Sequence, residues 1–295
     1  MTSVESRPGG VSVVIPAYNE EGAILDGLRE TQAILTGLEI ETELIVINDG
    51  STDRTAEIAR DAGFRVLDQP ENRGYGAALK AGIEAAKFEI IVITDADGTY
   101  PAKEIPAMLE HADQYDMVVG ARVGEHAAIP LVRRPAKWVL RVLAAYLAGR
   151  PIPDLNSGLR VLKRRHVKRF EHLLPSGFSF TTSITLASLC SDMLVHYHPI
   201  NYYERVGESK IRATHAIEFL VLILRTIVYF NPLKVFLPLG AFFFFGGLAK
   251  FGYDLVIGNL SESALLGFLG GTMLWAVGLL SDQIARTGLG GGRKS

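Results

Sequence analysis

The sequence has 295 residues, of which 48% are hydrophobic, and its formal net charge at pH 7 is -2. A near-neutral charge gives no support for nucleic-acid binding through phosphate neutralisation, and the single cysteine, Cys190, excludes an internal disulfide and a cysteine-rich metal site. The apolar excess lies after about residue 219, where charged residues nearly vanish, so a polar N-terminal domain is expected to lead into a membrane anchor.

Apolar and amphipathic segments alternate along the N-terminal part of the chain. Strands are expected at residues 11–15, 43–47, 65–67, 90–94, 116–120 and 194–203. Helices are expected at residues 20–35, 52–61, 74–86 and 101–114, the second of them capped by Ser51. Residues 133–150 are compatible with a further helix, and a loop rich in proline and glycine follows at residues 151–158. This alternation predicts an α/β domain at residues 11–212, with a mostly parallel sheet between layers of helices.

The C-terminal part contains three apolar segments. Residues 213–231 hold Arg225 within an apolar stretch, which is typical of an amphipathic helix that lies along a membrane surface. Residues 232–283 contain two segments, at about 233–257 and 264–280, that are long enough to cross a hydrocarbon core of about 30 Å. We therefore expect an interfacial helix followed by a transmembrane hairpin.

The charges around the expected hairpin predict its orientation. The short connection between the spans carries only Glu262, whereas Arg286 and two further basic residues lie in a tail at residues 284–295. By the positive-inside rule, the N-terminal domain and both ends of the chain are expected in the cytoplasm. The leader, residues 1–10, agrees because it lacks the apolar core of a signal peptide. Lys250 and Asp254 stand one helical turn apart in the first span and are expected to pair.

Acidic residues follow the expected strands at their carboxyl ends, where open parallel sheets bind ligands. Glu20 follows the first strand, Asp49 the second, and Asp95 and Asp97 the fully apolar strand at residues 90–94. Two carboxylates separated by one residue in an extended segment are hard oxygen ligands suited to Mg2+ or Mn2+. An acidic turn without any ligand is the alternative for this tripeptide taken alone.

Four motifs occur in order along the N-terminal domain. They are Val-Ile-Pro-Ala-Tyr-Asn-Glu at residues 14–20, Val-Ile-Asn-Asp-Gly-Ser-Thr-Asp at residues 46–53, Asn-Arg-Gly-Tyr-Gly at residues 72–76 and Asp-Ala-Asp at residues 95–97. Together they resemble inverting family 2 glycosyltransferases. Asp-Leu-Asn-Ser-Gly-Leu-Arg at residues 154–160 and Arg-Val-Gly-Glu-Ser-Lys at residues 205–210 are similar to the branch that contains dolichyl-phosphate mannose synthases and bacterial polyprenyl-phosphate glycosyltransferases. The resemblance covers roughly residues 11–280.

The resemblance implies a GT-A fold that binds a nucleotide sugar and a divalent cation. The residues expected around the nucleotide sugar are Pro16, Ala17, Tyr18, Glu20, Asp49, Asn72, Gly74 and Ala96, with Asp49 near the base. Asp95 and Asp97 are expected to hold Mg2+ or Mn2+ against the diphosphate. In the mannose synthases a glutamine two places after the second aspartate helps to hold the metal, and this sequence has Thr99 there.

The resemblance also implies an acceptor, the phosphate of a polyprenyl lipid, which is anionic near neutral pH and needs no strong general base. Positive side chains are needed instead, because guanidinium and ammonium groups bind phosphate oxygens. The candidates are Arg122, Arg133, Arg205 and Lys210, with Arg134 as a further cation. Asp154 matches a family acid near the reaction centre, where it either takes part in the chemistry or orients the acceptor or sugar; capping of the following turn is the other interpretation.

The histidines are interpreted as non-functional. His111, His166 and His172 are expected at the surface, and His196 and His198 are expected to alternate on a strand without further metal ligands.

The sequence does not exclude two other functions. One is a membrane glycosyltransferase that acts on a lipid or glycan hydroxyl, although the Gln-x-x-Arg-Trp motif of processive synthases is absent. The other is a non-catalytic nucleotide-binding scaffold in the membrane. The sequence does not decide the sugar, the choice between UDP and GDP, the length of the lipid or whether the protein forms a homo-oligomer.

Overall fold

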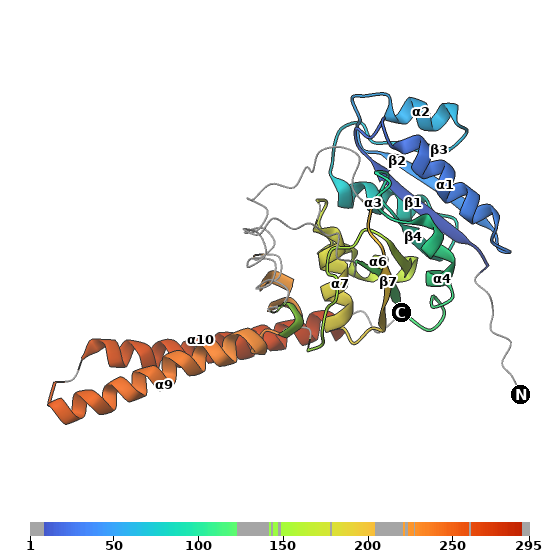
Figure 1. The fold of residues 1–295 in the computed structure, drawn as a ribbon. Coiled ribbons are helices and arrows are strands. Elements are labelled where there is room, and N and C mark those ends of the chain that lie inside the picture. Colours follow the sequence, from blue (N-terminus) through green and yellow to red (C-terminus); the bar gives the residue numbers. More distant parts are fainter. Residues whose placement is uncertain are drawn as a thin grey trace, which may run out of the picture.

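A seven-stranded sheet forms the centre of the N-terminal domain (Figure 1). The computed structural model describes residues 9–122, 142, 144–146, 149–177, 179–203, 221, 224–226, 228–259 and 261–290. The strands are β1 (Val11–Ala17), β2 (Thr42–Asn48), β3 (Arg65–Asp68), β4 (Ile90–Ile93), β5 (Met117–Arg122), β6 (Arg160–Lys163) and β7 (Val195–Ile200). Their order is β3-β2-β1-β4-β6-β5-β7, and every neighbouring pair is parallel except those that β6 makes with β4 and β5. The expected mostly parallel sheet is confirmed, and β6 is an antiparallel strand that the sequence pattern did not reveal.

Helices cover both faces of this sheet. They are α1 (Ile24–Thr36), α2 (Thr55–Asp61), α3 (Tyr75–Ala85), α4 (Ile105–Leu109), α6 (Arg164–Phe170) and α7 (Phe180–Cys190), with short 3-10 helices η1 (Ala102–Glu104) and η3 (Glu171–Leu173). Alternate side chains of β1 face opposite layers, so Val13 packs in a core with α1 and α4, whereas Val14 packs in a second core with α3 and α7. Burial of both faces accounts for the continuous apolar runs of the central strands.

The second helix begins at Thr55 rather than at the expected residue 52, and Ser51 is not its cap. The carboxylate of Asp53 instead accepts a hydrogen bond from the backbone nitrogen of Thr55, at 3.0 Å. The hydroxyl of Ser51 accepts a hydrogen bond from the backbone nitrogen of Asn19, at 3.1 Å. Ser51 therefore joins the loops that follow β1 and β2. It does not cap the helix, because the helix begins only at Thr55.

The segment between β6 and β7 contains two helices that were not expected. Helix α7 is buried on every side and has no amphipathic pattern, since threonine and serine alternate with apolar residues along it. Helix α6 carries His166, which was expected at the surface but is only 2% exposed. Its Nε2 lies 2.8 Å from the hydroxyl of Ser188 on α7, so this histidine packs one helix against the other. Burial lowers the pKa of His166, which favours the neutral ring.

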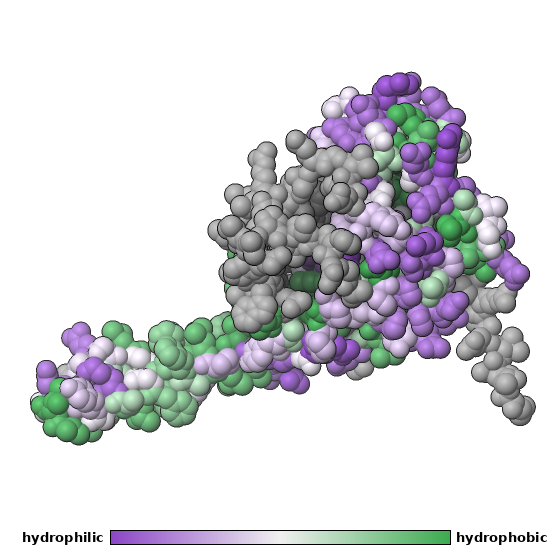
Figure 2. Space-filling model, viewed as in Figure 1, coloured by the Kyte–Doolittle hydropathy of each residue, from purple (hydrophilic) through white to green (hydrophobic). Residues whose placement is uncertain are grey.

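Two long helices, α9 (Leu233–Ile257) and α10 (Glu262–Gly290), form a hairpin that projects away from the domain (Figure 1). Both are long and apolar enough to cross a membrane, and most of their residues are exposed. Figure 2 shows apolar residues along the surface of the hairpin and polar residues near its far tip. The two helices lie where the spans are expected, but the second helix extends through residues 284–290, which the sequence pattern places in a tail.

Small residues bring the two hairpin helices into close contact. A side-chain carbon at Gly247 would overlap the backbone nitrogen of Phe268, and one at Gly271 would overlap the backbone nitrogen of Phe244. At the far end of α9, the buried carboxylate of Asp254 accepts hydrogen bonds from Lys250 and from the backbone nitrogen of Ser261. The expected pairing of Lys250 with Asp254 is therefore confirmed, and it also ties the turn between the helices.

The expected interfacial helix at residues 213–231 lies mostly outside the described residues. Its described part, at residues 221, 224–226 and 228–230, is helical. Phe230 is buried in the N-terminal domain, where its ring packs edge-on against Phe170 at a centroid distance of 6.0 Å. This contact fixes the start of the hairpin to the domain.

Candidate active site

A cavity of about 310 Å³ opens where β1, β2 and β4 end. Its lining consists of Pro16, Ala17, Tyr18, Glu20, Asp49, Asn72, Gly74, Tyr75, Ala78, Asp95, Ala96 and Asp97. Every residue that was expected around the nucleotide sugar lines it, and so do both expected metal ligands. The position agrees with the rule that open sheets bind ligands beyond the carboxyl ends of their parallel strands.

Hydrogen bonds join the loops that follow β1 and β2. The side-chain oxygen of Asn19 accepts a bond from the backbone nitrogen of Thr52 at 2.8 Å, and the backbone nitrogen of Glu20 donates to the hydroxyl of Thr55 at 2.8 Å. Asn19 has a φ of 53°, a left-handed conformation that asparagine tolerates better than most residues. This joined pair of loops fixes the wall of the cavity that carries Tyr18 and Glu20.

Asp49 organises another part of the cavity wall and is only 3% exposed. Its two carboxylate oxygens accept hydrogen bonds from the backbone nitrogens of Arg73 at 2.8 Å and Gly74 at 2.9 Å. Gly74 has a φ of 96°, and a side-chain carbon there would lie 2.6 Å from the carbonyl oxygen of Ser176. Asp49 thereby holds the segment that brings Asn72 and Gly74 to the cavity. The expected contact of Asp49 with a nucleotide base stays a prediction.

The acid pair is held by two side chains, Tyr75 and Thr99, that the motifs do not identify as site residues. The hydroxyl of Tyr75 donates to Asp95 at 2.8 Å, and burial together with this carboxylate raises the pKa of Tyr75 well above its usual value. The backbone nitrogen and hydroxyl of Thr99 donate to one oxygen of Asp97 at 3.1 and 2.6 Å. Thr99 thus orients Asp97, at the position where the mannose synthases have a glutamine.

The donor chemistry at this edge fits a divalent cation. Asp95 and Asp97 both line the cavity, and carboxylate oxygens are the ligands that Mg2+ and Mn2+ prefer. Gly158 approaches the pair so closely that a side-chain carbon there would lie 2.6 Å from a carboxylate oxygen of Asp95. The Asn-Ser-Gly sequence ending at Gly158 was noted in the resemblance, but the need for a glycine beside the acids follows only from the fold.

Asp154 and Arg122 form a two-point ion pair. The Nε and Nη2 atoms of Arg122 donate to the carboxylate of Asp154 at 2.7 and 2.9 Å, and the backbone nitrogen of Arg122 donates at 3.1 Å. Burial opposes the charged form of both groups, but the hydrogen bonds outweigh it, so the pKa of Asp154 is lowered and that of Arg122 is raised. Asp154 also accepts from the backbone nitrogen of Asn156 at 3.1 Å, so it caps the following turn as well.

Arg160, to which the sequence pattern assigns no role, supports the loop that carries Asp154. It is fully buried, and its guanidinium donates to the carbonyl oxygens of Ser157 at 2.7 Å and Leu155 at 3.0 Å and to the hydroxyl of Thr185 on α7 at 2.6 Å. Burial lowers the pKa of Arg160. An arginine at the start of β6, between Leu159 and Val161, is the sequence signal that could have indicated a buried contact here.

Three of the expected phosphate-binding residues, Arg133, Arg205 and Lys210, lie outside the described residues, as does Arg134. Arg122 is the expected phosphate ligand that the described part of the chain contains. The ring of Tyr202 lies 5.2 Å from its guanidinium carbon and packs edge-on against Tyr100, so an aromatic pair supports Arg122 in addition to Asp154.

Comparison with known proteins gives the family of both parts of the chain. Residues 12–170 match the glycosyl transferase family 2 model, and residues 231–287 match the GtrB C-terminal hairpin. The chain is 34% identical over 203 residues to a dolichyl-phosphate hexose transferase from Haloferax volcanii, covering 68% of this chain and 86% of that protein. It is 30% identical over 307 residues to an undecaprenyl-phosphate 4-deoxy-4-formamido-L-arabinose transferase from Pseudomonas aeruginosa, covering 94% of this chain and 85% of the relative.

A solved structure shares the fold of the N-terminal domain. Glucosyl-3-phosphoglycerate synthase from Mycobacterium tuberculosis, in complex with Mn2+, UDP-glucose and phosphoglyceric acid, superposes with a TM-score of 0.60 at 21% identity, over 74% of this chain and 79% of that one. The GT-A fold that the motifs implied is therefore confirmed, and the apolar hairpin marks a membrane protein. The chain belongs to glycosyl transferase family 2 and is a glycosyltransferase.

Proposed function

We propose that this protein transfers a hexose from a nucleotide sugar to the phosphate of a polyprenyl lipid, with inversion at the anomeric carbon. The observation that carries the proposal is the direct attachment of an apolar hairpin to a domain whose cavity contains the acid pair Asp95 and Asp97. Relatives over most of the chain are named for transfer to dolichyl phosphate and undecaprenyl phosphate, which supports the same class of acceptor.

The cavity walls form the donor site in this proposal. Tyr18 and Glu20 lie on one part of the wall, and Asp49 holds another part through the backbone of Arg73 and Gly74. Walls that are each fixed by hydrogen bonds are suited to holding the nucleotide while the sugar extends toward the acid pair. Both UDP and GDP sugars are compatible with this arrangement.

Asp95 and Asp97 would hold Mg2+ or Mn2+, which neutralises the negative charge that develops on the departing nucleoside diphosphate. Tyr75 and Thr99 fix the orientation of these carboxylates by donating hydrogen bonds to them. Fixed carboxylates do not have to reorganise as the bond breaks, so they favour the transition state over the bound substrate.

Arg122 and Asp154 would orient the acceptor phosphate. The lowered pKa of Asp154 keeps it ionised near neutral pH, so it cannot supply a proton and is best suited to holding Arg122 in place. A guanidinium has five N–H donors, and those of Arg122 that do not face Asp154 can bind phosphate oxygens. A phosphate monoester is already anionic, so the transfer needs orientation more than a general base. Arg133, Arg205 and Lys210 are proposed to complete this phosphate site.

The hairpin and the helix before it would hold the cavity at the membrane surface. The lipid tail of the acceptor cannot leave the bilayer, since each buried CH2 contributes about 0.8 kcal/mol, so the enzyme has to meet the phosphate where it emerges. The positive-inside rule favours a cytoplasmic position for the domain and both ends of the chain.

The direct test uses the full-length protein in lipid nanodiscs that contain polyprenyl phosphate. A panel of UDP- and GDP-linked hexoses is added with Mg2+ or Mn2+, and the lipid products are identified by mass spectrometry. The expected result is one preferred donor and a product heavier by one hexose, formed with polyprenyl phosphate and not with the free polyprenol. Equal transfer to the alcohol would instead favour a hydroxyl acceptor, and no transfer by any donor would favour the scaffold function.

A further inference from the structure

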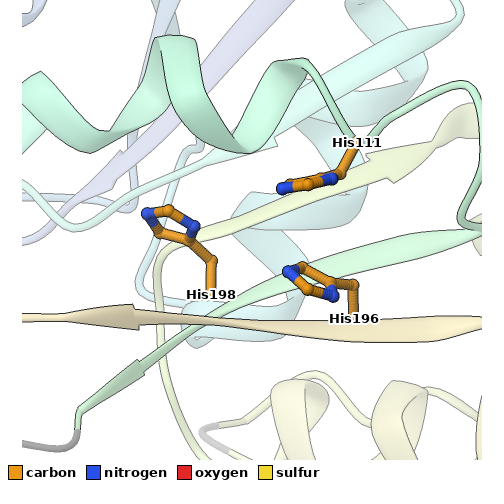
Figure 3. Close-up of side chains that lie close together, drawn as sticks. All are labelled: His111, His196 and His198. Carbon is orange, nitrogen blue, oxygen red and sulfur yellow. The ribbon is translucent and has the colours of Figure 1, made fainter.

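Three histidines from different parts of the chain meet at the edge of the sheet. His196 and His198 are two residues apart on β7 and therefore project from the same face of this strand, while His111 follows the end of α4 (Figure 3). One ring nitrogen from each of the three lies within 4.8 Å of the others, and the rings of His111 and His196 have a centroid distance of 4.4 Å. The expectation that His196 and His198 have no further ligand beside them is therefore wrong.

The backbone around this cluster is well supported. β7 pairs in parallel with β5, so that His196 lies beside Val118 and His198 beside Gly120. The backbone of His111 donates to Met108 at 3.2 Å and accepts from Tyr115 at 3.1 Å, which closes the turn after α4. All three rings are half-buried, so a small ion can reach them from solvent.

A carboxylate fixes the orientation of one ring. Nε2 of His198 lies 3.3 Å from a carboxylate oxygen of Glu104 in η1. When Nε2 donates to this carboxylate, the lone pair of the neutral ring lies on Nδ1. In Figure 3 one nitrogen of His198 points into the space between the rings and the other points away from it. A carboxylate behind a histidine in this manner is the arrangement that orients metal-binding imidazoles.

We propose that His111, His196 and His198 form a site for a divalent transition metal such as Zn2+, separate from the acid pair in the cavity. Imidazole nitrogens suit Zn2+, Co2+, Ni2+ and Cu2+, whereas carboxylates suit Mg2+ and Mn2+. Tetrahedral Zn2+ with Zn–N distances of about 2.0 Å needs nitrogens about 3.3 Å apart, which rotation of half-buried side chains can reach. Three protein ligands leave a fourth position for water.

The site would brace the strand that leads to the acceptor region. Beyond β7, the backbone of Tyr203 donates to the carbonyl of Thr99 at 3.0 Å, and Tyr202 packs against Arg122. A metal that joins β7 to the turn after α4 therefore stabilises the segment that holds Arg122 and the loop carrying Thr99. Its role is structural, because the three histidines do not line the cavity.

The test uses Co2+ as a spectroscopic probe on the full-length protein, purified in detergent through a tag without histidine and stripped with a chelator. Tetrahedral Co2+ with nitrogen ligands absorbs strongly in the visible range, whereas Co2+ bound octahedrally by oxygens absorbs weakly. We expect one equivalent of strongly absorbing Co2+, displaced by Zn2+ and not by excess Mg2+. In the same preparation, Zn2+ should raise the thermal unfolding temperature.

Variants then assign the signal to the cluster. His196→Gln and His111→Gln should abolish the visible band and the Zn2+-dependent rise in unfolding temperature. Glu104→Gln should weaken Co2+ binding about 10- to 100-fold, as expected when a group behind a ligand is lost. His172→Gln, at an exposed histidine on η3, is the matched control and should keep both signals. Asp97→Asn should also keep them, because it changes only the oxygen site.

Two results would overturn the proposal. One is a wild-type protein with neither a visible Co2+ band nor a Zn2+-dependent rise in unfolding temperature; the cluster, with Tyr115 packed at 4.9 Å from His196, would then be aromatic packing alone. The other is a band of full intensity in both His196→Gln and His111→Gln, which would place the metal elsewhere. The unfolding temperature of each variant without metal shows whether it has folded, so a lost band cannot be mistaken for a lost fold.

Discussion

The N-terminal domain and the hairpin distribute polar and apolar groups in opposite ways. In the domain the large apolar side chains are inside, and the acids that line the cavity lie at one edge of the sheet. In the hairpin the large apolar side chains face outward, while glycines and the carboxylate of Asp254 lie between the helices. The difference arises because water surrounds the domain and lipid surrounds the hairpin. Apolar side chains are buried away from water, whereas they can face lipid.

The two regions also differ in how local their contacts are. The domain joins β1 to β2 and β4, and its active-site edge combines residues from 16 to 97 with a loop at residues 154–158. The hairpin helices are neighbours in sequence and pack on each other along their length. A substitution in the domain is therefore expected to disturb contacts between segments that are distant in sequence, including those around the site. A substitution in the hairpin should disturb only the contacts between its two helices.

The contrast is sharpest for two phenylalanines. Phe180 on α7 is completely buried, so Phe180→Ala should reduce the free energy of unfolding by about 3 to 5 kcal/mol. Phe242 on α9 is 73% exposed and is expected to contact lipid tails, so Phe242→Ala should change stability in nanodiscs by less than about 1 kcal/mol. Thermal unfolding of both variants measures the difference. A large loss for Phe242→Ala would mean that this face packs against protein, such as a second copy of the chain.

Asp97→Asn tests the polar edge of the domain. Removing a group that stabilises charge at the reacting diphosphate should lower kcat about 100- to 1,000-fold. The exposed Asp61→Asn at the end of α2 is the control and should leave kcat unchanged. Initial rates at saturating donor with Mg2+ and with Mn2+ measure the effect. Normal turnover of Asp97→Asn with either ion would remove this residue from the proposed metal site.

Asp154→Ala should reduce the free energy of unfolding by about 3 kcal/mol at pH 7, because Arg122 loses its partner. The pKa of Asp154 is lowered in the folded state. The contribution of this carboxylate to the free energy of unfolding is therefore fully present above its unfolded pKa of about 3.9, and it is lost as the pH falls through its folded pKa. The difference in free energy of unfolding between wild type and variant should therefore be constant from about pH 5 to 7 and shrink below about pH 4. Unfolding midpoints across this range measure it, and a gap that persists in acid would assign the stability to something other than the ion pair.

Neighbouring glycines provide the test of close packing in the hairpin. A side-chain carbon at Gly247 would overlap the backbone of Phe268, whereas one at Gly246 has nothing within 4 Å. Gly247→Ala should separate the helices and destabilise the hairpin by about 1 to 3 kcal/mol, and Gly246→Ala should be neutral. Protease protection of the hairpin in nanodiscs compares the two. The same result for both would mean that the helices do not pack in this register.

Much of the candidate site could be predicted from the sequence because Asp49 and the pair Asp95 and Asp97 follow apolar strands at their carboxyl ends. Strand periodicity and the order of the motifs place Asp49, Asp95 and Asp97 at the same edge, and the structure gathers them around one cavity. The apolar spans were predictable for the same local reason, since length and composition alone identify them.

The parts that could not be predicted depend on contacts between distant segments. Helix α7 has no amphipathic pattern because it is buried on all sides, so the helix has no local signal, and the sequence around Arg160 does not identify Thr185 as its partner. Ser51 has the composition of a helix cap but is used to join two loops. His111 is separated by most of a domain from His196 and His198, and only the packing of α4 near the edge strand brings them together.

The most direct measurement compares the full chain with a chain that ends at Asn231, which lacks the hairpin but keeps Phe230 in the domain core. Both are supplied with the preferred nucleotide sugar and with two acceptors, polyprenyl phosphate in nanodiscs and a short water-soluble isoprenyl phosphate. The shortened chain should bind the donor and use the soluble acceptor at a similar rate, yet transfer to the membrane acceptor about 100-fold more slowly, because anchoring raises the effective concentration of the lipid phosphate. Equal rates of both chains on the membrane acceptor would contradict the proposed role of the hairpin.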